Sequence, residues 1–360
     1  MNINAPLSIR RRMGLEIFRR LENERTEEHQ LKQLFWECTL RCNLHCRHCG
    51  SDCKKIAGHP DMPKEDFLRV LDSVSAQNDP HKIFVIITGG EPLMRKDLEE
   101  CGRAIYERGF PWGMVTNGLY MTRERLNGLL DAGLHTATVS LDGFATDHNW
   151  MRGNPQSFER AVEAIKLMVQ VPDFVFDVVT CVNKHSYMRL EELKDFLISL
   201  GVKGWRLFTI FPVGRAAKDP ELQLSNEEFR GVMEFIRKSR KEGRIHVSYG
   251  CEGFLGNYEA EVRDTFFACR AGISVGSVLI DGAISACPSI RADYHQGNIY
   301  ENDFMEVWNH RFKPYRDREW MKKDECADCK YFSFCKGNGM HLRDENGDLL
   351  FCHLKRLQTP

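Results

Sequence analysis

The hydrophobic pattern between residues 34 and 211 alternates short apolar runs with stretches of helical period. A run of four to eight apolar residues predicts a buried strand, whereas apolar residues three and four positions apart predict the buried face of a helix. The two signals follow each other in turn along this region. The predicted strands are residues 34–38, 82–88, 112–116, 136–141, 174–182 and 205–211.

The predicted helices are residues 63–74, 97–109, 122–132, 157–169 and 190–200. Asp97 with Glu100 three residues later is the reciprocal capping arrangement that starts a helix, and Gly109 ends it. Strands separated by helices need crossover connections, so we expect a parallel sheet that is buried on both faces. In such α/β folds ligands lie at the carboxyl ends of the strands, where we therefore look for function.

Three cysteines, Cys42, Cys46 and Cys49, follow the first predicted strand within eight residues. Three thiolates can hold three corners of a cubic iron-sulfur cluster and leave one iron open for chemistry. A zinc site closed by Cys53, four residues further on, is the structural alternative.

The second predicted strand ends in Gly89, Gly90, Glu91 and Pro92. Two glycines let a backbone approach a ligand closely, and a carboxylate beside them can accept hydrogen bonds from an ammonium group. The same tetrapeptide also occurs in ordinary turns, so its position at a strand end is what favours a binding role.

The C-x3-C-x2-C loop, with Gly-Gly-Glu-Pro at a later strand end, resembles the signature of the radical S-adenosylmethionine (SAM) enzymes. The resemblance covers roughly residues 30–215. It implies a partial (β/α)6 barrel in which SAM binds the open iron of a [4Fe-4S] cluster through its amino and carboxylate groups. It places the cofactor contacts on Gly89, Gly90, Glu91 and Pro92 for the amino group, Ser140 and Asp142 for the carboxylate and ribose, and Thr180 and Val182 for the adenine. Asn117, at the end of the third predicted strand, is a further cofactor contact.

The C-terminal third carries a second set of cysteines, which resembles the SPASM extension of radical SAM enzymes. That extension normally holds two auxiliary [4Fe-4S] clusters with seven cysteines, and Gly339 stands at one of the seven positions in this chain. The resemblance assigns a complete outer auxiliary cluster to four of the six cysteines that remain. The six are Cys269 and Cys287, followed by the outer set of Cys326, Cys329, Cys335 and Cys352.

Two cysteines cannot hold a cubane alone, which leaves three outcomes for the inner auxiliary site. Cys251 joins Cys269 and Cys287, with the fourth position open or taken by His341; the site holds a [2Fe-2S] cluster; or it is empty. The glycines on both sides of the Cys251-Glu252 pair favour the first outcome. An isolated Cys251 would instead be a small buried apolar residue.

We expect four segments along the chain. Residues 1–33 form an N-terminal extension, 34–215 the barrel, 216–250 a linker and a helix opened by a capping box at Ser225, and 251–360 the iron-sulfur domain. The extension contains a short basic amphipathic helix. It either suits an acidic partner or a membrane surface, or packs on the main domain through Met13, Ile17 and Leu21.

Composition narrows the functional class. A chain of 360 residues with 42% hydrophobic content can bury a sizeable core, and a net charge of -1 argues against a nucleic-acid partner. Fourteen cysteines that cluster at metal-ligand spacing, without a signal peptide, indicate a reducing cytoplasm. No apolar run approaches the ~20 residues that a membrane span needs.

The resemblance also implies the chemistry. An electron from a flavodoxin- or ferredoxin-type donor cleaves SAM to a 5′-deoxyadenosyl radical, and the outer auxiliary cluster lets an electron leave the substrate, so the net reaction is oxidative. SPASM enzymes mostly modify peptides or proteins, which makes such a substrate the leading expectation. Pro288 stands where the sulfatase-maturing members have an acidic base, and this counts against that activity.

Two other functions are open. The first is an enzyme acting on a small-molecule cofactor precursor such as a tetrapyrrole, since some enzymes of that kind carry SPASM-like extensions with fewer clusters. The second is a non-catalytic iron-sulfur electron carrier, which would leave Glu91 and Asp142 without a role.

Overall fold

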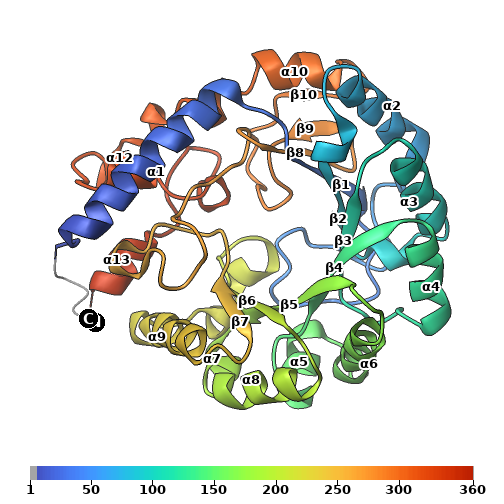
Figure 1. The fold of residues 1–360 in the computed structure, drawn as a ribbon, viewed down its shortest axis with the longest axis horizontal. Helices are drawn as coiled ribbons and strands as arrows, with labels where there is room; N and C mark the ends of the chain where they lie inside the picture. The colour runs from blue at the N-terminus through green and yellow to red at the C-terminus, as the bar shows by residue number, and fades with distance from the viewer. Residues whose placement is uncertain (1–5, 360) are drawn as a thin grey trace.

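The computed structural model describes residues 6–359, and their strands form one ten-stranded sheet that curves round a central space (Figure 1). The strand order is β10-β9-β8-β1-β2-β3-β4-β5-β6-β7. Each pair of neighbours in the run β8-β1-β2-β3-β4-β5-β6-β7 is parallel. At one edge β9 pairs antiparallel with β8, and β10 pairs antiparallel with β9. The strands are β1 (Gln33–Thr39), β2 (Phe84–Gly89), β3 (Trp112–Thr116), β4 (Leu134–Ser140), β5 (Val175–Val182), β6 (Gly204–Thr209), β7 (His246–Tyr249), β8 (Val275–Val278), β9 (Ala283–Ser285) and β10 (Gly297–Asn298).

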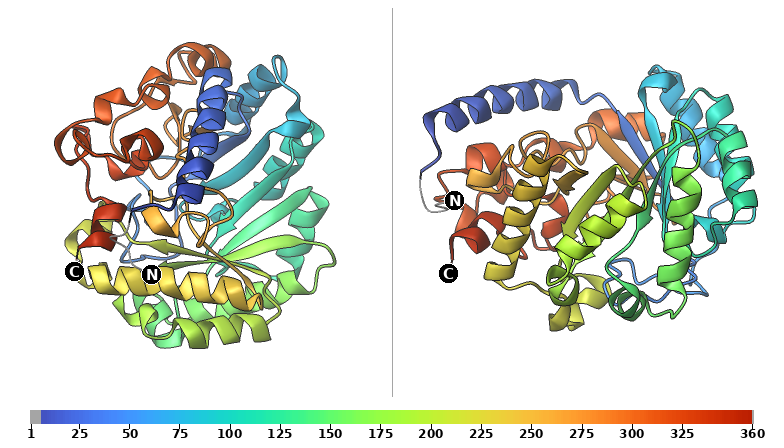
Figure 2. Two further views of the ribbon diagram at one scale, coloured as in Figure 1. Left: turned by 60° about the vertical axis from the view of Figure 1, so that its left-hand side comes forward. Right: turned by 60° about the horizontal axis from the view of Figure 1, so that its bottom comes forward.

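Helices cover the outside of the curved sheet, so the expected barrel-like α/β fold with parallel strands is confirmed (Figures 1 and 2). The capping box at Ser225 is also confirmed, with both reciprocal hydrogen bonds present. The helices are α1 (Ile9–Glu28), α2 (Lys64–Ser75), α3 (Leu98–Glu107), α4 (Arg123–Asp131), α5 (Ala145–Arg152), α6 (Ser157–Val169), α7 (Lys184–Tyr187), α8 (Leu190–Ser199), α9 (Asn226–Glu242), α10 (Phe304–His310), α11 (Lys313–Arg316), α12 (Phe332–Cys335) and α13 (His353–Gln358).

The predicted cap of α3 is wrong. Asp97 stands at the N-cap, but its side chain makes no capping hydrogen bond. Its carboxylate instead accepts two hydrogen bonds from Arg95, at 3.0 and 2.8 Å. A bidentate bond to a buried guanidinium is stronger than a bond to a backbone amide, so the arginine takes the carboxylate.

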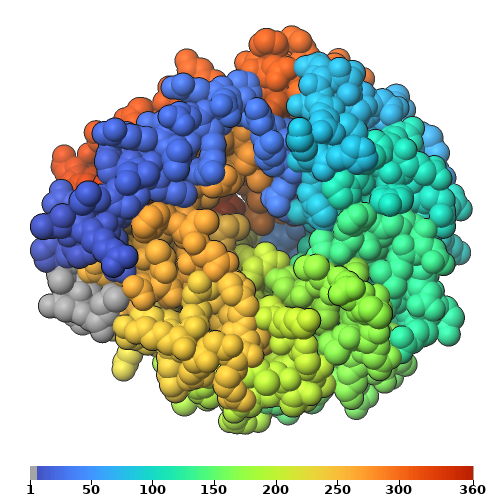
Figure 3. All heavy atoms as spheres, in the orientation of Figure 1, coloured from blue at the N-terminus to red at the C-terminus, as the bar shows by residue number. Residues whose placement is uncertain are grey.

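The two faces of the sheet differ in burial. In β2, Val85 and Ile87 point to the helices and are fully buried, whereas Phe84 and Ile86 point inward and remain partly exposed. The expectation of burial on both faces is therefore wrong for the inner face, because curvature turns that face toward a cavity. This cavity, which we call the lumen, measures about 570 Å³ and is lined by the first residues of β1 to β6. Figure 3 shows the molecule hollowed at the centre of the ring of strands.

The C-terminal segment extends the same sheet. β8 pairs in parallel with β1, and Glu37 of β1, 2% exposed, ties the two regions together. Its carboxylate accepts from Arg291 at 3.0 Å and from the amide of Ile280 at 3.2 Å. The boundary proposed between residues 215 and 216 falls in a run of short turns, Gly214–Lys218 and Pro220–Leu222, at the far edge of the barrel.

Helix α1 lies across the C-terminal region, beside α12 (Figure 2). It packs through Leu15, 2% exposed, and through Phe18, whose ring centroid is 5.6 Å from that of Phe266. The prediction that this helix packs through Met13 and Ile17 is wrong, since these side chains are 62% and 61% exposed. No helix in residues 6–359 has both the length and the apolar character of a membrane span.

Candidate functional site

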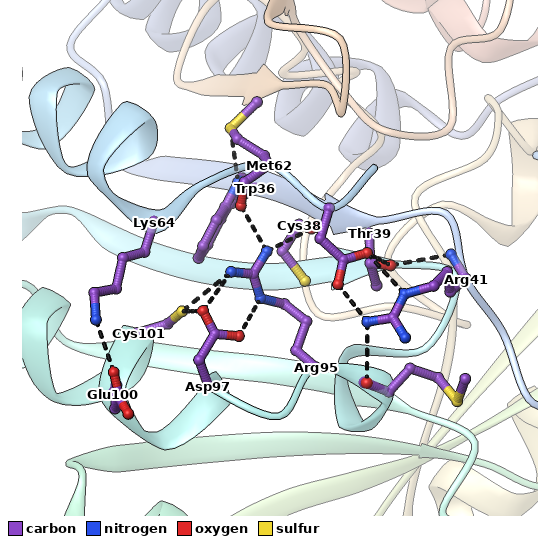
Figure 4. Close-up of polar contacts among 12 residues, drawn as sticks. Trp36, Cys38, Thr39, Arg41, Met62, Lys64, Arg95, Asp97, Glu100 and Cys101 are labelled. Carbon is purple, nitrogen blue, oxygen red and sulfur yellow. Dashed lines mark hydrogen bonds and ion pairs between the residues drawn. The ribbon is translucent and has the colours of Figure 1, made fainter. Parts of the chain in front are cut away.

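The chain between β1 and the cysteine loop is fixed by two arginines (Figure 4). Arg95, 3% exposed, donates through Nη1 to the carbonyls of Cys38 at 2.9 Å and Met62 at 2.7 Å. Arg41, which directly precedes the first cysteine of the loop, donates through Nε to Asp61 at 3.0 Å. These bonds hold the end of β1 and therefore the start of the loop.

A cavity of about 180 Å³ lies at the carboxyl ends of β1 to β4, and the cysteine loop forms one side of it. Eight of the twelve residues predicted for the first cluster and for SAM meet on its wall. They are Cys42, Cys46, Cys49, Gly89, Gly90, Glu91, Asn117 and Ser140. Two arginines that the sequence did not single out, Arg152 and Arg215, stand on the same wall.

The spacing of the loop cysteines bears on the choice between zinc and an iron-sulfur cluster. Zinc–sulfur bonds of about 2.3 Å in a tetrahedron hold the sulfurs about 3.8 Å apart, whereas a cubane spreads its thiolates more widely. Within residues 6–359, the single set of three candidate ligand atoms within 4.8 Å of one another is His48, Asp142 and Cys181. No three of the loop thiols therefore lie within 4.8 Å of one another in the described residues, and they are not held at the spacing of a closed zinc site.

Cys53 lies beside the loop cysteines and lines the same cavity. A hydrogen bond from its side chain lowers the pKa of Cys49 to about 5. Burial raises the pKa of Cys42 to about 12. Cys53 therefore acts on the thiol next to it through a hydrogen bond.

Glu91 is 1% exposed and organises the ends of two strands. Its Oε1 accepts from Thr116 Oγ1 at 2.8 Å and from the amide of Leu93 at 3.1 Å, and Oε2 accepts from the amide of Asn117 at 2.7 Å. Burial raises the pKa of Glu91, while these three donors pull it down. The carboxylate is therefore held in one orientation on the cavity wall.

The two glycines before Glu91 are required by the backbone. A Cβ atom on Gly89 or Gly90 would collide with the carbonyl oxygen of Thr39 or Arg41 respectively. The amide of Gly90 donates to the Thr39 carbonyl at 2.7 Å. The close approach is thus between the end of β2 and the chain leading into the cysteine loop, and it keeps the loop beside the cavity.

Asp142 lies behind the cavity wall and is fully buried. It accepts from Arg152 Nε at 2.6 Å and from the amide of Cys181 at 2.9 Å. Burial raises the pKa of this carboxyl, but the Arg152 guanidinium together with His48 and His148 outweighs burial, and the pKa falls to about 2. Because Arg152 already neutralises Asp142, the close group with His48 and Cys181 is not a metal site.

Arg152 connects this carboxylate to the cysteine loop. It is 7% exposed, and its Nη1 lies 3.8 Å from Cys46 Sγ. The residue ends α5, a helix that the hydrophobic pattern did not indicate. A positive charge beside a cluster thiolate, on the wall of the cavity, suits both an anionic cluster and a ligand carboxylate.

The remaining predicted contacts lie behind the wall. Thr180 is fully buried, donates to the Leu141 carbonyl at 2.5 Å and accepts from Trp205 Nε1 at 2.8 Å. Val182 is fully buried as well, and Pro92 begins a short turn after Glu91. The structure does not bring these three residues to the cavity.

The cysteines of the outer set interact with one another. Burial raises the pKa of Cys335, and the thiols of Cys352, Cys326 and Cys329 raise it further. Arg343, 3% exposed, donates from Nη2 to Cys326 Sγ at 3.4 Å. The sequence did not single out this arginine, which supplies a positive charge to the outer group.

Cys251, Cys269 and Cys287 form a second group. Burial raises the pKa of Cys287 to about 12, with further contributions from Cys251 and Cys269. Arg318 holds the loop of Cys269 by donating to its carbonyl at 2.8 Å. The C-terminal thiols thus influence one another within each of two sets.

Two family models match the chain. The radical SAM superfamily model matches residues 36–197, and the SPASM model, an iron-sulfur cluster-binding domain, matches residues 269–330. The first model contains the cysteine loop and Glu91, and the second contains Cys269 and Cys287.

Characterised relatives align over most of the chain. AdoMet-dependent heme synthase of Methanosarcina barkeri is 27% identical over 88% of this chain and 93% of that protein. Fe-coproporphyrin III synthase of the same organism is 28% identical over 84% of this chain and 82% of that protein. PqqA peptide cyclase of Rhizobium meliloti is 23% identical over 85% of this chain and 82% of that protein.

The fold recurs in solved structures. SuiB of Streptococcus suis bound to S-adenosylmethionine superposes with a TM-score of 0.69 at 19% identity, covering 87% of this chain and 75% of SuiB. At this identity the likeness shows the fold. The two family models, which match residues 36–197 and 269–330, show that the chain belongs to the radical SAM superfamily and, within it, to the SPASM-domain subgroup.

Proposed function

We propose that this radical SAM enzyme oxidises an iron tetrapyrrole. AdoMet-dependent heme synthase and Fe-coproporphyrin III synthase are 27% and 28% identical to this chain, whereas PqqA peptide cyclase is 23% identical, which supports this substrate class over a peptide. The structural observation that carries the proposal is the lumen, which offers an apolar chamber with positive charge at its rim.

The lumen is lined by aromatic side chains that suit a flat apolar ring. Phe35, Phe84 and Phe176 line it, as do Lys203 and the ion pair of Arg206 with Asp177. Stacking and burial of a macrocycle on aromatic rings is favourable, and guanidinium and ammonium groups pair with its carboxylate substituents.

The lumen lies next to the cavity beside the cysteine loop, because the side chain of Val115 lines both. A ring in the lumen would therefore lie directly below a ligand held at the carboxyl ends of the strands. This arrangement brings a substrate C–H bond to the cofactor while the barrel wall excludes water.

The residues of the cavity wall have distinct roles in this proposal. Cys42, Cys46 and Cys49 hold the [4Fe-4S] cluster, which with SAM supplies the 5′-deoxyadenosyl radical. The fixed carboxylate of Glu91 accepts from the ammonium group of SAM, and Arg152 pairs with its carboxylate.

The other predicted contacts keep supporting roles in the proposal. Asn117 and Ser140 complete the polar wall, Asp142 orients Arg152, and Pro92, Thr180 and Val182 shape the strand ends. The outer cysteines Cys326, Cys329, Cys335 and Cys352 hold the cluster that takes up an electron from the substrate, and an external flavodoxin or ferredoxin reduces the first cluster.

The test is a substrate panel with the anaerobically reconstituted enzyme, SAM and a chemical reductant. We expect Fe-coproporphyrin III to stimulate release of 5′-deoxyadenosine and to change in mass by liquid chromatography–mass spectrometry. The proposal would be refuted if only peptides in the panel stimulated release of 5′-deoxyadenosine and the tetrapyrrole did not change in mass.

Arg206 provides a matched test of the lumen. Arg206→Leu is expected to weaken binding of Fe-coproporphyrin III, followed by its absorbance, by roughly 10- to 100-fold, as for loss of one charge-assisted hydrogen bond. Arg189→Leu is the control, because the two side chains are equally exposed at 42% and Arg189 lies on the outer surface with Glu192. Equal binding by both variants would exclude the lumen as the chamber.

A peptide or protein substrate is the second candidate. The alignment to PqqA peptide cyclase over 85% of the chain favours it, as does the stretch from Cys335 to Leu342, which resembles a branch whose genes accompany small lipoproteins. A short peptide or lipoprotein gene beside this one would favour the second candidate, whereas genes of cofactor biosynthesis would favour the first.

A further inference from the structure

The inner auxiliary site has three cysteines and needs a fourth ligand to complete a cubane. Cys251, Cys269 and Cys287 interact electrostatically, so they lie in one group. The fourth cysteine of the SPASM pattern is replaced by Gly339. The question is which side chain, if any, faces this group in its place.

The structure shows that a cysteine cannot stand at position 339 without rearrangement. A Cβ atom built on Gly339 would lie 2.7 Å from Cε1 of His341 and 2.8 Å from the carbonyl oxygen of Glu252. The backbone closes one side of this space and an imidazole ring fills the other. His341 therefore occupies the space into which the missing cysteine would extend.

The ring is also next to the loop that carries Cys251, because Glu252 directly follows that cysteine. Phe211 packs on the other side of the ring, with centroids 4.7 Å apart. The loop itself is fixed, since Glu252 is fully buried and its Oε1 accepts from the amide of Thr209 at 2.9 Å. The imidazole is thus held between Phe211 and the loop that carries Cys251.

His341 is 8% exposed, and its Nε2 atom is buried without a hydrogen-bond partner among the described residues. A buried polar atom without a partner destabilises a fold and calls for an explanation, such as an ion missing from the coordinates. The other buried histidine nearby differs, since Nε2 of His353 lies 3.2 Å from Tyr249 and 3.3 Å from Glu252.

We propose that His341, through Nε2, is the fourth ligand of an inner iron-sulfur cluster held by Cys251, Cys269 and Cys287. Imidazole replaces thiolate as an iron ligand in other iron-sulfur proteins, where the exchange raises the reduction potential. A neutral ligand in place of a thiolate makes the cluster less negative by one charge. The inner cluster then accepts an electron more readily than an all-cysteine cluster of the same site.

The experiment uses the full chain with Cys42, Cys46 and Cys49 changed to Ala, reconstituted anaerobically, so that only auxiliary clusters remain. We expect about eight irons per chain, as for two cubanes. Pulsed electron paramagnetic resonance of the reduced protein should show a strongly coupled nitrogen on one cluster. In His341→Cys we expect the same iron count, no such nitrogen and a lower midpoint potential.

Two further variants separate ligation from folding. His353→Gln removes a buried imidazole from the same region, and the coupled nitrogen should persist. Gly339→Ala places a methyl group against the ring, so the nitrogen coupling should weaken although His341 is still present.

The proposal would be overturned if the triple-alanine protein held about four irons, or if it held about eight irons and showed no coupled nitrogen. Persistence of the nitrogen signal in His341→Cys would overturn it as well. If the substituted chains fail to fold, the spectrum of the parent decides alone. Since the test needs neither SAM nor substrate, its failure is distinct from failure of the proposed function.

Discussion

The buried pair of Asp142 and Arg152 offers the sharpest test of how the site is held. Asp142→Asn keeps the oxygen that accepts from the Cys181 amide but turns an NH2 group toward Arg152 Nε. The guanidinium is 7% exposed and would be left without its counter-charge. Breaking a buried ion pair from one side costs about 3–5 kcal/mol.

The pKa of Asp142 gives an independent magnitude. It falls from an ordinary value of 3.8 to about 2 in the folded chain. At about 1.4 kcal/mol per pKa unit, the charged form contributes about 2–3 kcal/mol of stability, with no discount for solvent because the group is buried. Since the folded pKa is depressed, this contribution is present above pH 3.8 and is lost as the pH falls through about 2.

The assay is a double-mutant cycle by anaerobic urea unfolding of the cluster-loaded protein. Asp142→Asn and Arg152→Met should each cost about 3–5 kcal/mol, whereas the double variant, which buries no net charge, should cost clearly less than their sum. Costs that add within about 0.5 kcal/mol would refute the reasoning, because they would show that the two groups do not stabilise each other.

Three other substitutions test separate parts of the site. Gly90→Ala should destabilise the protein by about 1–3 kcal/mol and lower its iron content, since the new methyl group collides with a carbonyl of the preceding loop; normal iron content would contradict this. Glu91→Gln should weaken SAM binding, measured by equilibrium dialysis, by about tenfold or more. The side-chain amide has one oxygen that accepts hydrogen bonds, whereas both carboxylate oxygens of Glu91 accept them. Unchanged affinity would count against the role of Glu91. Arg343→Met should lower the midpoint potential of the outer cluster, measured by redox titration, because a positive charge next to Cys326 is lost; an unchanged potential would contradict this.

The main elements of the fold were predictable because each has a strong local signal. The helix predicted over residues 157–169 is found as α6, Ser157–Val169. The strands β7, β8, β9 and β10 were missed, since they span four, four, three and two residues and carry no period long enough to detect. Their place in the sheet depends on pairing with distant strands, which no local pattern encodes.

The same limit explains the helix α1. A helical period identifies an apolar stripe but does not say which stripe faces the protein, and the chain buries Leu15 while it leaves Met13 exposed. The choice depends on the surface that the C-terminal region presents, where Phe266 receives Phe18.

Within the site, the cysteines and Glu91 were predictable because they lie close together in sequence at a strand end. Arg152 was not, because its sulfur contact in the cysteine loop is 106 positions away. Asp142 was identified as a ligand contact, but the structure shows its carboxylate engaged with Arg152 behind the wall. The sequence thus locates the polar groups, and only the fold decides which of them reach the cavity.

The two auxiliary sites are joined by a buried contact that bears on electron flow. Glu252 follows Cys251 of the inner group, and His353 follows Cys352 of the outer group. Both side chains are fully buried, and His353 Nε2 lies 3.3 Å from Glu252 Oε2. Glu252 also accepts from the amide of Thr209, and His353 Nε2 also lies 3.2 Å from Tyr249, so the contact is part of one buried polar network. Because this network is built from buried side chains, the fold sets the spacing of the two loops, and the clusters proposed at the two sites inherit that spacing.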